Sequence, residues 1–209
     1  MKTIYLIRHA QSQSNAHANS TNKIIYRNHQ IALSDLGHQQ ACHLADMLIQ
    51  QIPTPTQVFV SSYIRTHQTA KPYLNKLGMS AQILDNLHQF DYLDFEHITG
   101  KGFDELYQMS EVFWQRPNDY KDSPNCESYD NSVARVQSIR AYFKTLPDGT
   151  YVVFTHGMWI SMLIWQLLNS SLIHQKVTFR QFEQTIRPNN TDMYRLALWN
   201  AQESIAKVV

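Results

Sequence analysis

"KTIYLIRH" at residues 2–9 and "TYVVFTHG" at residues 150–157 are the two stretches that decide the fold. Each is short, apolar and partly β-branched, a pattern typical of a strand buried on both faces of a sheet. In each, a histidine follows the apolar run: His9 in the first and His156 in the second. Because ligands of open parallel sheets bind beyond the carboxyl ends of the strands, these histidines are predicted to stand at a binding site.

Other short apolar runs alternate with helical patterns along the chain. Strands are predicted at residues 57–62 and 81–84, and helices at 33–51, 63–78, 128–146 and 157–168. Ser34 is the expected N-cap of the first helix. Gly78 is expected to end the second helix, in which Pro72 predicts a kink or a break. Residues 192–200 and 204–209 are predicted to form a hairpin around "NAQE".

Strands and helices that alternate at this spacing predict an α/β fold with three layers: a mostly parallel sheet with helices on both faces. We expect a single domain over residues 1–209, with residues 88–131 inserted as a cap above the strand ends. This segment holds 10 of the 17 acidic residues, three of the 18 basic ones and nine aromatic residues. Its acidic charge argues against highly anionic substrates.

The overall composition narrows the class of protein. Apolar residues make up 43% and charged residues 17% of the 209, and the net charge is +1. This balance predicts a soluble globular protein without nucleic-acid or membrane partners. No apolar run reaches the ~18 residues of a spanning helix, and the N-terminal run is too short for a signal peptide. Two cysteines, Cys42 and Cys126, make no disulfide framework, so the expected location is the cytoplasm.

A cationic cluster is predicted at the strand ends. It comprises Arg8, His9, Arg65 and His156, with Asn15 close by. Two guanidiniums and two imidazoles directed at one point repel each other unless an anion binds between them, and the arginine fork matches phosphate. Such neighbours keep a histidine in its neutral, nucleophilic form. Each residue alone is more often a surface or structural side chain, so the prediction of phosphoryl transfer rests on their joint placement.

Five motifs in order resemble those of the histidine phosphatase superfamily, which includes the cofactor-dependent phosphoglycerate mutases. The first is "RHAQSQSN" at 8–15, similar to the family's R-H-G motif with Ala10 in place of glycine. The others are "LSDLGHQQA" at 33–41, "SSYIRTHQTA" at 61–70, "CESYDNSVARV" at 126–136 (with Cys126 for glycine) and "VVFTHG" at 152–157.

The resemblance implies a role for each matching residue. His9 would be the phosphorylated nucleophile, while Arg8, Arg65 and His156 would bind the phosphoryl group with help from Asn15. It implies no metal ion and no cofactor.

One position departs from the family. A glutamate often follows the third strand there and donates a proton to the leaving group, but "NLHQFDYLDFEH" at 86–97 has Gln89 at that place. An amide can position a leaving oxygen, so we assign Gln89 to substrate binding. The proton donor stays open among Asp91, Asp94 and Glu96, or the register differs.

The expected function is that of a metal-independent phosphomonoester hydrolase acting on a small phosphorylated molecule. One alternative is a phosphoglycerate mutase-type phosphotransferase, although the E-R-H-Y-G-like stretch and extra cations of mutases are missing from the insert. Another is a regulatory protein that binds a phosphorylated ligand with weak turnover, motivated by Gln89. A metal-binding protein is disfavoured because no H-E-x-x-H or C-x-x-C appears and His38 and His43 do not share a helix face. Substrate and oligomeric state stay open.

Overall fold

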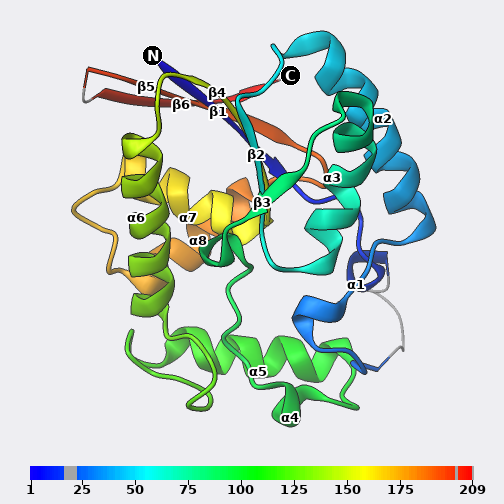
Figure 1. Ribbon diagram of the computed structural model, residues 1–209. Coiled ribbons are helices and arrows are strands. Elements are labelled where there is room, and N and C mark those ends of the chain that lie inside the picture. The colour runs from blue at the N-terminus through cyan, green and yellow to red at the C-terminus, as the bar shows by residue number, and fades with distance from the viewer. Residues whose placement is uncertain (17–22, 201, 209) are drawn as a thin grey trace.

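The computed structural model describes residues 1–16, 23–200 and 202–208. Within them, six strands form one sheet in the order β3-β2-β4-β1-β5-β6 (Figure 1). The strands are β1 (Lys2–Arg8), β2 (Gln57–Val60), β3 (Ala81–Ile83), β4 (Gly149–Thr155), β5 (Met193–Trp199) and β6 (Gln202–Val208). β1 to β4 run parallel, whereas β5 pairs antiparallel with β1 and β6. The mostly parallel sheet and the hairpin are confirmed; Ala201 in the predicted turn and Val209 lie outside the described residues.

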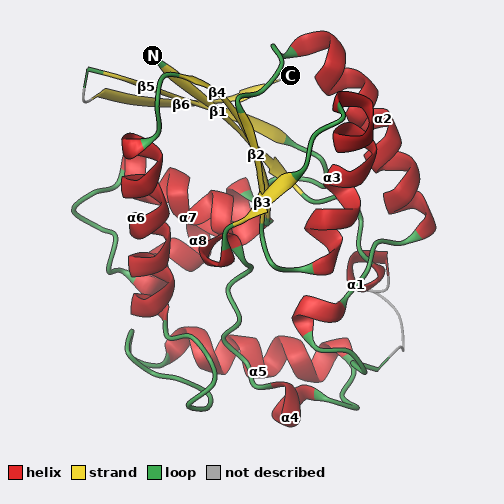
Figure 2. Ribbon diagram, viewed as in Figure 1, coloured by secondary structure: helices red, strands yellow, loops and turns green. Residues whose placement is uncertain are grey.

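Helices cover both faces of this sheet (Figure 2). One face carries α2 (Asp35–Gln51) and α3 (Ile64–Leu77), and the other carries α6 (Tyr129–Thr145), α7 (Gly157–Leu168) and α8 (Lys176–Ile186). Val58 and Val60 of β2 pack into the core beneath α2 and α3, while Phe59 packs into the core on the α6 and α7 side. Because successive strand residues point to opposite faces, each central strand serves two cores. The predicted three-layer α/β fold is confirmed.

The predicted helix signals give mixed outcomes. The Ser34 hydroxyl accepts a hydrogen bond from the backbone N–H of Gly37 at 3.1 Å, which confirms the N-cap of α2. Gly78 adopts φ +63° at the end of α3, as expected of a terminating glycine. Pro72 lies inside α3, and the helix continues to Leu77, so the predicted break is wrong. Its neighbours Ala70 and Tyr73 are buried in the core, and this packing holds the helix together.

The chain between β3 and α6 lies beyond the end of the sheet where the parallel strands finish (Figures 1 and 2). It contains the 3-10 helix Asp85–Leu87, α4 (Phe95–Ile98) and α5 (Phe103–Gln115); α1 (Gln13–Ala16) and the 3-10 helix Asn28–Gln30 complete the elements. α5 packs against α8, with the rings of Trp114 and Phe179 6.1 Å apart between centroids. The sequence patterns predict neither α5 nor α8.

Candidate active site

The parallel register brings the ends of β1 and β4 together. Arg8 pairs with Thr155, so the next residue of each strand, His9 and His156, lies beside the other, with ring centroids 5.2 Å apart. Arg65 comes from the first turn of α3, which follows β2, the other neighbour of β4. The structure thus brings together the arginines and histidines that the sequence places at the strand ends.

The hydrogen bonds of His9 define its tautomer. Nδ1 lies 2.7 Å from the carbonyl oxygen of Ala10, which can only accept, so Nδ1 carries the proton. Nε2 holds the lone pair and accepts a hydrogen bond from Nε of Arg65 at 3.2 Å. Burial, followed by the charges of Arg65 and Arg8, holds the pKa of His9 well below its usual value. His9 is therefore a neutral imidazole with a potential nucleophile at Nε2.

Arg65 is fixed on its other edge by Asn28. Nη1 donates to the Asn28 carbonyl oxygen at 2.6 Å, and Nη2 donates to Oδ1 at 3.1 Å. The guanidinium lies over the ring of Tyr63, 4.9 Å from its centroid. Burial is the main cause that lowers the pKa of Arg65 to about 10, so the side chain stays charged at neutral pH. Asn28 follows no predicted strand, so the sequence carries no signal for it.

Arg8 meets the beginning of α7 at Gly157. Nη1 of Arg8 donates to the Pro188 carbonyl oxygen at 2.5 Å, and its buried Nε has no partner among the described residues. A Cβ atom on Gly157 would lie 3.3 Å from both Cδ and Nε of Arg8, so the glycine permits this close approach. Gly157 lines the cavity at a helix N-terminus, where free backbone N–H groups favour an anion. Arg8 and the N-terminus of α7 thus present neighbouring donors that suit an anion.

His156 has no exposed surface and is oriented by Ser61. Its Nε2 lies 2.8 Å from the Ser61 hydroxyl oxygen, which lies 2.9 Å from the hydroxyl of Thr66. Nδ1 has no hydrogen-bond partner in the described part of the chain. Burial, followed by the charge of Arg65, holds the pKa of His156 well below its usual value. Ser61 is a further site residue, and its signal in the sequence is its place directly after β2.

Asn15 lies in the cavity wall beside His9. Its Oδ1 accepts hydrogen bonds from the backbone N–H of Ser12 at 3.3 Å and from Nδ2 of Asn190 at 3.2 Å. Asn190 also donates to the carbonyl oxygen of His9 at 2.9 Å. With its oxygen occupied, Asn15 is left with its amide N–H donors for a ligand. Asn190 precedes β5, 181 residues after His9, and sequence reasoning did not identify it.

A cavity of about 590 Å³ opens above these residues. The segment 88–131 and α8 supply much of its wall. Its apolar and aromatic lining includes Tyr26, Phe90, Tyr92, Leu93, Phe103, Leu106, Tyr107 and Met158, and its charged lining comprises Arg8, Arg65, Asp91, Asp104, Arg180 and Arg187. Only two of the ten acidic residues of 88–131 line the cavity, and the extra cations come from α8 and the residue that directly follows it. The acidity of 88–131 therefore does not describe the cavity wall, which carries four arginines against two aspartates.

The structure separates the candidates for a proton donor. Asp94 caps α4 by accepting from the backbone N–H of Glu96, and Glu96 pairs with Arg27 at the surface. Neither lines the cavity, whereas Gln89 and Asp91 do. Gln89 Oε1 is buried with no partner among the residues described.

Asp91 is held beside the cationic cluster. Its carboxylate accepts from Nδ2 of Asn28 at 3.2 Å and from the Tyr63 hydroxyl at 3.4 Å. The same Asn28 side chain binds Arg65 through Oδ1, so hydrogen bonds link Asp91 to His9 by way of Asn28 and Arg65. Burial is the main cause that raises the pKa of Asp91, which favours a carboxyl that carries a proton.

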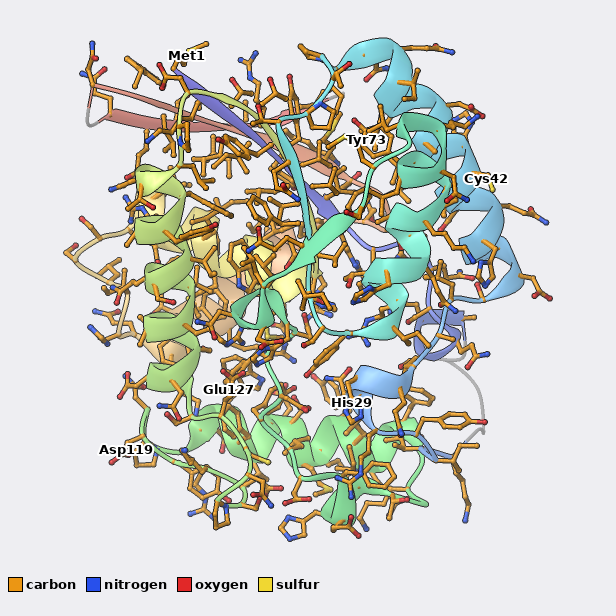
Figure 3. All side chains as sticks on the ribbon, viewed as in Figure 1. Met1, His29, Cys42, Tyr73, Asp119 and Glu127 are labelled. Carbon is orange, nitrogen blue, oxygen red and sulfur yellow. The ribbon has the colours of Figure 1, made fainter. Side chains whose placement is uncertain are left out.

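A buried ion pair fixes the segment that carries Gln89 and Asp91. Glu127, just before α6 (Figure 3), accepts from Nε and Nη2 of Arg135 at 2.6 and 2.8 Å. Arg135 also donates to the carbonyl oxygen of His88 at 2.7 Å, and Glu127 accepts from the backbone N–H of Asp91 at 3.3 Å. Burial opposes the charge of Glu127, but hydrogen bonds from His88 and Arg135 lower its pKa to about 2. Both Glu127 and Arg135 come from the fourth family-like motif.

Two features are absent from the described residues. No group of three or more histidine, cysteine, aspartate or glutamate side chains there is placed to hold a metal ion. None of the helices in these ranges has both the length and the apolar character needed to cross a bilayer.

Comparison with known proteins places the chain in a family. Residues 4–208 match the family model of the histidine phosphatase superfamily (branch 1). A curated relative, the PE-PGRS family protein PE_PGRS11 of Mycobacterium tuberculosis (strain ATCC 25618 / H37Rv), is 36% identical over 85 residues. That match covers 39% of this chain and only 14% of the relative, so the chain spans about a seventh of that protein.

Solved structures match over nearly the whole chain. The α-ribazole phosphatase of Shigella flexneri has a TM-score of 0.75 and 16% identity, covering 99% of this chain and 95% of that one. A phosphoserine phosphatase variant of Entamoeba histolytica scores 0.71 with 19% identity, covering 99% and 96%. A mycobacterial glucosyl-3-phosphoglycerate phosphatase scores 0.70 with 18% identity, covering 98% and 97%. At such identities these structures show a shared fold, and the family model shows that the chain belongs to the histidine phosphatase superfamily.

Proposed function

We propose that the protein is a metal-independent phosphomonoester hydrolase that forms a phosphohistidine on His9. The observation that carries this proposal is the tautomer of His9, because the bond from Nδ1 to Ala10 leaves the lone pair on Nε2. Arg65 donates to that nitrogen, Arg8 lines the same cavity, and His156 is buried beside the His9 ring. We further propose one domain over residues 1–209, with 88–131 as the cap that closes the cavity.

The first step transfers the phosphoryl group to the protein. Nε2 of His9 attacks phosphorus, an N–P bond forms, and the bond from phosphorus to the ester oxygen breaks. As Nε2 attacks, the Nε–H of Arg65 turns from His9 to a phosphoryl oxygen. Asp91 gives its proton to the departing oxygen, so the alcohol leaves neutral and Asp91 becomes a carboxylate. Arg8 neutralises the charge of the phosphoryl oxygens and His156 and Asn15 orient them, which is the main catalytic demand of this reaction.

The second step returns the protein to its starting state. A water molecule attacks phosphorus, the N–P bond breaks, and the Asp91 carboxylate takes a proton from that water. Orthophosphate and neutral His9 result, and Asp91 is protonated again. Gln89 cannot supply that proton, but its amide lies in the cavity wall and is suited to binding the leaving oxygen or the attacking water.

The relatives support the class of substrate. Proteins of this fold are named as phosphatases of α-ribazole phosphate, phosphoserine and glucosyl-3-phosphoglycerate, all small phosphorylated molecules. A cavity of about 590 Å³ accommodates a molecule of that size. Cys42 and Cys126 are free thiols, which supports a reducing compartment such as the cytoplasm.

The test is hydrolysis of p-nitrophenyl phosphate by the wild type and by His9→Ala. We expect turnover by the wild type, none by His9→Ala, and a phosphohistidine detected in the wild type after an alkaline quench. His43→Ala, on the exposed side of α2, is the matched control and should behave as wild type. Full activity in His9→Ala would contradict the nucleophile assignment. Binding of phosphate without turnover by the wild type would instead favour a regulatory phosphate-binding protein.

A mutase-type phosphotransferase is the second candidate, and one observation favours it. Arg180 and Arg187 add two cations to the cavity, which helps to retain a bisphosphate. Interconversion of 3- and 2-phosphoglycerate in the presence of 2,3-bisphosphoglycerate would support this activity. Release of orthophosphate alone supports the hydrolase.

A further inference from the structure

The cavity contains a second cationic centre that lies outside all five family-like motifs. It is formed by Arg180 and Arg187 of the α8 region, with Glu183 between them. Glu183 has no exposed surface. Its carboxylate accepts hydrogen bonds from Nε and Nη2 of Arg187, the latter at 2.7 Å, and from Nη1 of Arg180 at 3.2 Å. A fixed anion thus holds two guanidiniums in the cavity wall.

Arg187 is the member of this centre with a free donor edge. Its bonds to Glu183 use Nε and Nη2, and within the described ranges no partner is recorded for Nη1. Its side chain is 43% exposed although it lines the cavity. Arg180, in contrast, is only 11% exposed and is also paired with Glu111 at 3.3 Å. Arg187 is therefore the arginine whose donors remain available to a ligand.

Arg187 lies in the cavity wall next to residues of the proposed phosphoryl site. A Cβ atom on Gly157 would be 3.3 Å from Cγ of Arg187 and equally close to Arg8, so the two arginines pack against the same glycine. After burial, the charge of Arg187 is the main cause that lowers the pKa of Arg8. Tyr92, whose hydroxyl bonds Ser110 at 2.7 Å in the cavity wall, acts electrostatically on Arg187. Arg187 thus stands between the phosphoryl site and the surface that faces the leaving group.

The local charge indicates how much negative charge this position accepts. Apart from Arg8, which is assigned to the phosphoryl group, Arg180 and Arg187 carry two positive charges in this part of the wall, and Glu183 offsets one of them; Glu111, which pairs with Arg180, does not line the cavity. One positive charge therefore remains in excess, which matches a carboxylate better than a second, dianionic phosphate. A guanidinium also presents its donors in a plane that suits carboxylate oxygens.

We propose that the substrate carries a carboxylate close to the phosphate ester, and that Arg187, positioned by Glu183, binds this carboxylate. The inference rests on the proposed function, since it assigns the substrate class of the same cavity. It makes Arg187 a specificity-determining residue and leaves the chemical step to His9.

The test compares two substrates that differ only in the carboxylate, O-phosphoserine and O-phosphoethanolamine. We expect wild type to favour phosphoserine in kcat/KM by about 10- to 100-fold, the usual size of one charge-assisted hydrogen bond. Arg187→Gln should reduce this preference at least tenfold, chiefly through the KM for phosphoserine. Arg187→Lys should keep part of the preference because the charge remains. Arg195→Gln, on the exposed side of β5, removes a charge elsewhere and should leave the preference intact.

Several outcomes would overturn the inference. They are no preference in wild type, an unchanged preference in Arg187→Gln, or equal losses on both substrates, which would place Arg187 on the transferring phosphoryl group. Turnover of p-nitrophenyl phosphate distinguishes this failure from failure of the proposed function. If wild type hydrolyses none of the three compounds, calorimetric binding of phosphoserine against phosphoethanolamine decides the question, with the same expected ratio and the same variants.

Discussion

Arg65 donates a hydrogen bond from Nε to Nε2 of His9 across 3.2 Å, so the proposed nucleophile and its nearest cation are direct partners. This hydrogen bond directs the lone pair on Nε2 of His9 toward the positively charged guanidinium of Arg65. Asn28 fixes the remaining guanidinium nitrogens. In the proposed first step, a phosphoryl group that enters between them gains the Arg65 donor as His9 attacks.

We therefore expect Arg65→Ala to lower kcat/KM for p-nitrophenyl phosphate by roughly 10²- to 10³-fold, the usual loss for one donor at a developing charge. Lys71→Ala, an exposed position on the same helix, is the control for a lost surface charge. A decrease below about threefold in Arg65→Ala would mean that its guanidinium does not bind the phosphoryl group.

Asp91→Asn should separate substrates by their leaving groups. An alkoxide leaves poorly without a proton, and general acid help is worth roughly 10²- to 10⁴-fold, whereas nitrophenolate leaves almost unaided. Alkyl phosphate turnover should therefore fall far more than aryl turnover in steady-state assays. Glu96→Gln, outside the cavity, is the matched control.

The position of Gln89 offers the complementary experiment. Because Gln89 lines the same cavity, Gln89→Glu in the Asp91→Asn background should restore part of the alkyl phosphate turnover. Gln89→Glu alone adds a second carboxylate and should slow both reactions. If Gln89→Glu alone instead accelerates alkyl turnover and Asp91→Asn changes little, Asp91 is not the donor.

The rate profile should depend on pH in a defined direction. Because the pKa of His9 lies well below the usual value of about 6.5, His9 stays neutral and kcat/KM should not fall as pH drops from 7.5 to 6. The pKa of Asp91 is raised, and the proposed mechanism requires its proton, so the basic limb should come from Asp91. Asp91→Asn should lose this limb with an aryl substrate, and a basic limb that persists would assign it to another group.

The free energy of unfolding should decrease at acidic pH, because the folded state lowers the pKa values of His9 and His156. His9 and His156 are neutral when folded but take up protons below about 6.5 when unfolded, so the unfolded chain binds more protons. Their contribution is complete above that pH and is lost as pH falls towards their folded pKa values. Denaturant titrations at pH 7.5 and 5.5 should show this loss, and His156→Gln should reduce its slope relative to wild type.

Gly157→Ala should impair phosphate binding more than folding. The added methyl group would lie 3.3 Å from Arg8 and Arg187, tighter than most packed contacts, so both side chains must move. We expect the inhibition constant for vanadate to rise about tenfold, the cost of weakening one charge-assisted hydrogen bond. Gly102→Ala, where the nearest atom to an added Cβ is 4.0 Å away, is the control. Equal vanadate inhibition in both variants would show that Arg8 does not need this approach.

Local sequence was enough for the central sheet and for the four predicted residues of the cationic cluster. The runs at 2–8 and 149–155 are apolar because they are buried on both faces, and a parallel sheet aligns their carboxyl ends. His9 and His156 meet because β1 and β4 are also neighbours in this sheet, which the strand order of the folded chain decides. Gln89, singled out within one stretch of sequence, lies in the cavity wall.

Tertiary structure alone decided the rest of the site. α8 is not predicted from the sequence although Phe179, Phe182 and Ile186 recur at helical spacing, and the charges of its two other buried residues, Lys176 and Glu183, give no sign of burial. Its arginines reach the cavity only because the chain returns from α7 across the strand ends. Contacts that join residues more than 170 positions apart, such as Asn190 with His9, depend on that return and leave no local pattern. The sequence thus determined which residue types follow the central strands. Packing determined which other groups line the cavity, because a charge can be buried only beside partners that the folded chain brings together.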